Sequence, residues 1–141
     1  MTSTTTNRSA QDVLAISQGV FDMVFGAWPI AHLPSFEVVT GPKVDGWLVK
    51  AVGSLLTVVG GVLLAAGAKR RVTPELRALA MGKGLALATI DFVYVSRKRI
   101  PRVYLLDAAL HLGFVGAWAI LGAPVVAPDA PVVAKEPSVA P

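Results

Sequence analysis

The sequence predicts an all-α integral membrane protein, a bundle of four transmembrane helices joined by short loops. Hydrophobic residues make up 54% of the 141 residues and charged residues only 16%, whereas a soluble domain carries roughly a quarter charged residues. The mean hydropathy is +0.62, and the charges cluster between long apolar runs instead of being spread evenly. Such a pattern is typical of a chain embedded in lipid.

The first apolar run predicts a helix over about residues 11–33. Ser9 is a suitable N-cap because Asp12 follows three residues later and completes a capping pattern. Pro29 is expected either to kink this helix or to end it early, and Pro34 closes it.

The second and third runs predict helices over about residues 46–68 and 74–96. Asp45 precedes the second helix as a good N-cap, and residues 34–45 before it are expected to form the longest internal loop. Thr73 caps the third helix, with proline at the first helical position. Both runs are long enough to span a bilayer with some tilt.

The fourth helix is expected over about residues 101–121, starting at Pro101 and stopped by Gly122 and the proline that soon follows. Together the spans define a membrane domain over residues 11–122. Residues 1–10 form a polar N-terminal tail, and residues 123–141 are rich in proline and alanine, which favours a disordered tail. The alternative for this last segment is a partner-docking tail.

An architecture with three spans is the rival interpretation. Lys83 and Asp91 lie inside the third helix, so in this alternative that helix rests on the membrane surface. Its middle, residues 84–95, is strongly apolar, which favours a span.

Glycines recur at a spacing of seven within two of the predicted helices. They are Gly19 and Gly26 in the first helix, and Gly53, Gly60 and Gly67 in the second. Seven residues are close to two helical turns, so each set lies on one face. Small residues allow helices to approach closely in lipid, which predicts tight contacts within the bundle, with a dimer interface as the alternative.

Ionisable residues inside the spans are the most informative feature, because they are costly in lipid and usually pair. We call the membrane side at the start of the first helix side A and the opposite side B. Counted along alternating helices, Asp22 and Lys83 both lie about 10–15 Å in from side A, which predicts a structural ion pair. Lys50, Asp91 and Asp107 lie near side B and form a second predicted cluster.

The cluster near side B extends to aromatic and basic neighbours. Tyr94 and Tyr104 lie three residues from the two aspartates, and His111 lies one turn beyond Asp107 on the same helix face. The interpretations are a structural polar network, or a site for a polar headgroup, an anionic ligand, a quinone or a proton. Lys50 has a further alternative, which is to reach the headgroups alone. The candidate ligand-binding residues are Lys50, Asp91, Tyr94, Arg102, Tyr104, Asp107 and His111.

Several classes of chemistry have no support in the sequence. The chain has no cysteine, which excludes disulfides and thiolate metal sites, and its two histidines are far apart. It contains no phosphate-binding loop, no dinucleotide fingerprint and no zinc-protease or nucleophile-elbow motif. No metal, cofactor or nucleic acid is therefore expected, and the basic residues are assigned to anchoring helix ends.

Three segments resemble small, uncharacterised four-span bacterial membrane proteins, broadly similar to the DoxX-like group. The segments are residues 47–53 (WLVKAVG), 91–95 (DFVYV) and 102–108 (RVYLLDA). The resemblance covers roughly residues 11–121 and implies an accessory membrane subunit linked to a quinone-dependent oxidoreductase complex. No residues match a catalytic motif of that kind, so the resemblance carries no enzymatic activity over.

The leading functional hypothesis is a non-enzymatic accessory or interaction subunit, multi-pass in the cell inner membrane. Its expected partners are the lipid bilayer and either another membrane protein or further copies of itself. The alternative is a protein that handles a small molecule, lipid, quinone or proton through the intramembrane cluster. Basic residues near the spans are equally numerous on sides A and B, so the positive-inside rule does not orient the chain. An uncleaved polar N-terminus favours both termini in the cytoplasm.

Overall fold

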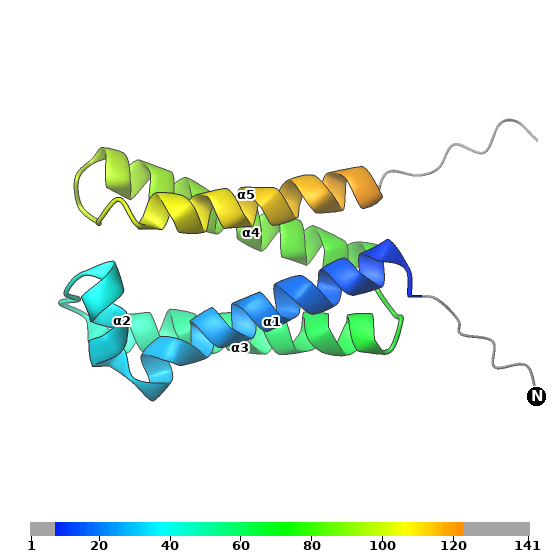
Figure 1. The fold of residues 1–141 in the computed structure, drawn as a ribbon, viewed down its shortest axis with the longest axis horizontal. Helices are drawn as coiled ribbons and strands as arrows, with labels where there is room; N and C mark the ends of the chain where they lie inside the picture. Colours follow the sequence, from blue (N-terminus) through cyan, green and yellow to red (C-terminus); the bar gives the residue numbers. More distant parts are fainter. Residues whose placement is uncertain (1–7, 123–141) are drawn as a thin grey trace, which may run out of the picture.

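The computed structural model describes residues 8–122 and is entirely helical in its regular elements there (Figure 1). The tail predicted over 123–141, and most of that predicted over 1–10, lie outside the described residues. Four of the helices are long and apolar enough to cross a membrane, which confirms the all-α membrane bundle. The helices are α1 (Ala10–Ala31), α2 (Leu33–Thr40), α3 (Gly46–Ala68), α4 (Pro74–Ser96) and α5 (Tyr104–Leu121).

The four long helices form two antiparallel pairs. α1 packs along α3, and α4 packs along α5, with α1 also meeting α5 between the pairs (Figure 1). One end of the bundle, side A, holds the start of α1, the α3–α4 connection and the end of α5. The other end, side B, holds α2 and the α4–α5 connection. The short connections therefore make each long helix cross in the direction opposite to the one before it.

The first predicted helix ends two residues earlier than expected, and the loop predicted after it is wrong. α1 ends at Ala31, and α2 occupies most of the expected loop. His32 separates the two helices with an extended φ of −154°, and its Nδ1 accepts a hydrogen bond from the backbone N–H of Ser35 at 3.1 Å. Pro34 lies in the first turn of α2, where a missing N–H costs nothing. The proline therefore opens a second helix, and Pro29 lies inside α1 without ending it.

α5 begins at Tyr104, three residues later than predicted. The N–H groups of Tyr104 and Leu105 bond to the carbonyls of Pro101 and Arg102 at 3.2 and 2.9 Å. These are three-residue steps, typical of the tighter turns that often precede an α-helix. Pro101 thus starts a tight turn that leads into the helix rather than the helix itself.

The predicted glycines form the contact between α1 and α3. A methyl group built on Gly60 would lie 2.7 Å from the carbonyl oxygen of Gly19, and one built on Gly26 would lie 2.6 Å from that of Gly53. Gly67 faces the backbone of α1 at Asp12 in the same way. Only hydrogen fits between such backbones, so these positions explain the close approach of the two helices.

The bundle carries its large apolar side chains on the outside. Examples are Val24, Leu55, Phe92 and Ile120, one on each long helix, which are between 58% and 77% exposed. Fully buried apolar residues include Ala15, Leu63, Ala80 and Trp118. A bundle embedded in lipid exposes apolar side chains and packs small or polar ones inside. The protein is therefore a small multi-pass membrane protein.

Candidate intramembrane polar site

Asp22 and Lys83 form an ion pair between the two helix pairs. Lys83 Nζ of α4 donates to Asp22 Oδ1 of α1, and the two side chains are 11% and 1% exposed. This is the pair indicated by their matching depth in the sequence. Asp22 is held there because it lies at the edge of the glycine contact, with its Cβ beside Gly60. Its second oxygen, Oδ2, is buried without a hydrogen-bond partner.

A second group of ionisable side chains lies between α4 and α5. His111 Nε2 is 3.6 Å from Asp107 Oδ2, one helical turn away on α5. Asp91 of α4 is 5% exposed, and its carboxyl group lies near that of Asp107. The ring of Phe21 from α1 meets the His111 ring edge-on, with 5.6 Å between the ring centroids.

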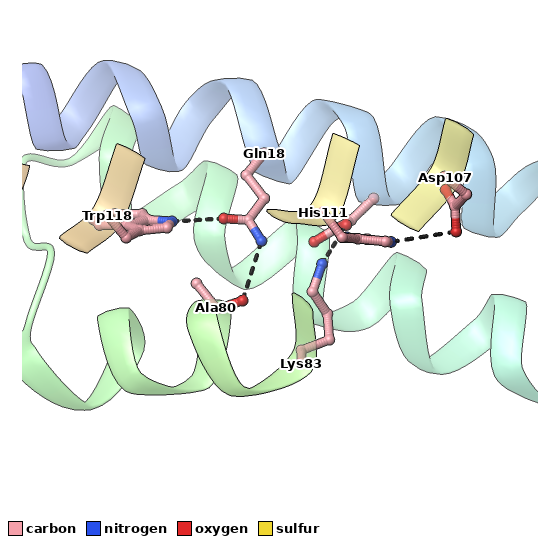
Figure 2. A network of polar contacts seen from close by, with 7 residues as sticks. Gln18, Ala80, Lys83, Asp107, His111 and Trp118 are labelled. Atoms are coloured by element: carbon pink, nitrogen blue, oxygen red, sulfur yellow. Dashed lines mark hydrogen bonds and ion pairs between the residues drawn. The ribbon is translucent and has the colours of Figure 1, made fainter. Parts of the chain in front are cut away.

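The two groups lie next to each other in the bundle and form one unit, since Lys83, His111 and Asp107 follow one another in Figure 2. We call this unit the buried ionisable network; its members are Asp22, Lys83, Asp91, Asp107 and His111. It sets three carboxyl groups against one ammonium group and an imidazole. Three of its buried polar atoms have no hydrogen-bond partner, namely Asp22 Oδ2, Asp91 Oδ2 and His111 Nδ1. A network in this state has capacity for a further positive charge or proton.

A neutral polar contact lies beside the network, toward side A. Gln18 of α1 is fully buried; its Oε1 accepts from Trp118 Nε1 of α5 at 2.6 Å, and its Nε2 donates to the carbonyl of Ala80 on α4 at 3.3 Å (Figure 2). Figure 2 shows this contact and the pair of His111 and Asp107 along the same stretch of the bundle. Sequence reasoning missed Gln18 and Trp118 because it considered only ionisable groups. The available signal was a glutamine within the apolar part of the helix, one turn before Asp22.

The network is open at one end and closed at the other. Asp107, in the first turn of α5, has a side chain that is 36% exposed on side B, whereas Asp91 and His111 behind it are buried. Toward side A, the contact of Gln18 with Trp118 lies among side chains with no exposure. Asp107 is therefore the member of the network that lies nearest the surroundings on side B.

Four of the predicted site residues do not join the network, namely Lys50, Tyr94, Arg102 and Tyr104. Lys50 is exposed on α3, which packs on α1 in the other helix pair (Figure 1), and Tyr94 and Arg102 are also exposed. The predicted cluster of Lys50 with the two aspartates is therefore wrong. Counting along a helix does not give the rotation of the helix about its own axis, and this rotation carries these side chains outward.

The basic partner on side B is a residue that sequence reasoning did not select. Lys43 Nζ lies 5.0 Å from the centroid of the Tyr104 ring and donates to the carbonyl of Thr40 at 2.6 Å. Tyr104 is therefore engaged with the loop after α2 by a cation–π contact. Because α2 was not predicted, the position of Lys43 at the start of α5 was not predictable either.

The described side chains of the network do not form a metal site. In residues 8–122, no three histidine, aspartate or glutamate side chains come close enough together to hold a metal ion.

Comparison with known proteins adds no assignment: no family model, no curated protein and no solved structure matches the chain.

Proposed function

We propose that this multi-pass membrane protein takes up and releases a proton within the bilayer, at the buried ionisable network. The observation that carries the proposal is the charge count of the network, three carboxyl groups against one ammonium group. Lys83 balances Asp22, which leaves Asp91 and Asp107 without a cation. Uncompensated charge inside a membrane is costly, so a proton between these two carboxyl groups is the simplest neutralisation.

The geometry supplies a direction for proton entry. Asp107 is the member of the network that lies nearest the surroundings on side B, and it lies near both Asp91 and His111. A proton from side B binds a carboxylate oxygen of Asp107, and the new O–H group then donates to Asp91. His111 Nδ1 is unpartnered and lies deeper, so it is a second acceptor on the same route. The contact of Gln18 with Trp118 excludes water beyond this point.

Infrared spectroscopy of the purified protein in lipid nanodiscs tests the proposal, because a protonated carboxyl group has its own C=O band. We expect the wild type to show a protonated carboxyl band that disappears on alkalinisation and returns on acidification. Asp91→Asn and Asp107→Asn should each abolish this band. Asp45→Asn is the matched control, since Asp45 is exposed and its side chain makes no cap hydrogen bond.

Two results would reject the proposal. One is a wild-type spectrum with no pH-dependent protonated carboxyl band. The other is a band that survives in both network variants while their helical circular dichroism is unchanged, because the proton would then reside elsewhere.

The resemblance to DoxX-like proteins supports a second, compatible proposal: the chain is an accessory subunit of a complex in a bacterial inner membrane. Its support is the three similar segments, residues 47–53, 91–95 and 102–108. Native mass spectrometry of gently extracted protein is the test. Other proteins at fixed stoichiometry would support the subunit role, and a protein released alone or only with lipid would count against it.

A further inference from the structure

The connection between α4 and α5 is a rigid turn that carries basic side chains. Lys98 adopts a left-handed conformation with φ of 55°, and its N–H bonds to the carbonyl of Val95 at 2.9 Å. The next N–H, of Arg99, bonds to the carbonyl of Tyr94 at 2.9 Å. These bonds close the end of α4 in the manner of a Schellman cap. The basic side chains are therefore presented from a defined backbone at the membrane boundary.

A cleft of about 530 Å³ opens between this turn and the end of α2. Gly41 and Pro101 approach each other in its wall: Gly41 has φ of 81°, and a methyl group there would lie 3.0 Å from Pro101 Cγ. No carboxylate lines the cleft, and neither salt bridge found in residues 8–122 involves its cations. The cationic residues that line it are Lys98, Arg99 and Arg102.

Two arginines on side A are engaged by carbonyl groups, unlike the three cations of the cleft. Arg8 donates to the carbonyl of Gly67 at 3.2 Å, and Arg77 donates to that of Gly122. These arginines satisfy carbonyl groups at helix ends, which is a structural task. The exposed cations around the cleft on side B have no such bond, so they are available to an anion.

An apolar helix face continues from the cleft toward the middle of the membrane. Val95 of α4 lines the cleft, and Phe92 lies three residues before it on the same helix face. Phe92 is 67% exposed. A phosphate group with an attached acyl chain matches this surface along its whole length, whereas a free anion uses only its upper part.

We propose that this cleft binds the phosphate of an anionic glycerophospholipid from the side B leaflet, with the acyl chain lying against Phe92. Arginine forms paired, charge-assisted hydrogen bonds with phosphate oxygens, which suits Arg99 and Arg102 to this role. The proposal is independent of the proton-handling function, since no member of the buried ionisable network lines the cleft.

Native mass spectrometry of protein released from vesicles of equal phosphatidylglycerol and phosphatidylcholine tests the proposal. We expect the wild type to retain one phosphatidylglycerol in preference to phosphatidylcholine. The double variant Arg99→Gln and Arg102→Gln should lower this retention by about tenfold or more, because charge-assisted hydrogen bonds are lost. The matched control is Lys69→Gln with Arg71→Gln, which removes the same charge at the end of α3 on side A and should leave retention unchanged within about twofold.

Three outcomes would overturn the proposal. In the first, the wild type would retain both lipids equally. In the second, the side A control would lose phosphatidylglycerol as strongly as the cleft variant, which would indicate a general charge effect. In the third, millimolar inorganic phosphate would displace the lipid fully, identifying the ligand as a free anion. Circular dichroism of each variant shows that it is folded.

Discussion

Lys83 lies where the two helix pairs meet, and its ammonium group balances the carboxylate of Asp22. A buried ion pair gains little over two apolar residues, because both charges lose their hydration. Removing only one partner is different, since the other charge then remains in an apolar environment without compensation. The pair therefore adds little net stability, but losing either residue alone is costly because the other charge stays buried without a partner.

We expect Lys83→Met to lower the free energy of unfolding by about 3–5 kcal/mol, the usual result of breaking a buried pair from one side. Unfolding by sodium dodecyl sulfate in mixed micelles, followed by circular dichroism, measures this. The double variant Asp22→Leu with Lys83→Met should recover most of the loss.

Lys50→Met serves as the control for loss of a lysine within a span. Lys50 is exposed on α3, so the expected change is within about 0.5 kcal/mol. A Lys83→Met protein as stable as the wild type would contradict the structural role of the pair.

α1 is the element on which the arrangement depends, because different faces of it serve different purposes. Gly19 and Gly26 bring α1 against α3 with backbone in contact with backbone. Gln18 and Asp22, on an adjacent face, supply the polar contacts to α4 and α5. The close packing of one face thus fixes the rotation of α1, and this rotation aims the polar side chains inward.

Gly60→Ala should separate α1 from α3 and destabilise the bundle by about 1–3 kcal/mol, the usual range for overpacking. Its new methyl group would lie 2.7 Å from the carbonyl oxygen of Gly19 and 2.8 Å from both Asp22 Cβ and the backbone nitrogen of Met23. The same unfolding titration in detergent measures the change.

Gly61→Ala is a control from the neighbouring position. The nearest atom there is the sulfur of Met23 at 4.0 Å, an ordinary contact. Alanine also favours a helix by up to about 1 kcal/mol over glycine. Equal stability losses in the two variants would show that the α1–α3 contact is not the cause.

The two membrane sides of the molecule differ in what their polar side chains contact. On side A, arginine side chains bond to carbonyls at helix ends. On side B, the cleft at the α4–α5 turn and the exposed carboxyl group of Asp107 face the surroundings. Both proposed activities, proton entry and lipid binding, therefore belong to the same membrane face.

Cysteine labelling tests this two-sided arrangement, because the chain contains no cysteine of its own. Val44→Cys lies before α3 on side B, and Lys69→Cys lies just after it on side A. A membrane-impermeant maleimide should label the two variants from opposite sides of a sealed membrane. Leu63→Cys, at a position with no exposure, should remain unlabelled until the protein is denatured. Labelling of both exposed sites from one side would contradict the span of α3.

Part of the candidate site was predictable because it depends on distance along a helix. Each residue advances an α-helix by about 1.5 Å, so the matching depths of Asp22 and Lys83 could be counted from the helix ends. The spans themselves follow from the length of the apolar runs, since lipid requires internally bonded backbone over a fixed thickness. The glycine spacing likewise marked the face of α1 that packs on α3.

The sequence by itself therefore determined the fold class, the order of the spans and the depth of each charged residue. The tertiary structure alone decided which side chains meet. Lys50 is exposed on α3, away from the two aspartates, and Gln18 reaches Trp118 across 100 residues of sequence. The physical reason is that the bilayer constrains length and hydrophobicity, which any one segment reveals, whereas the rotation of each helix is set by packing against its neighbours.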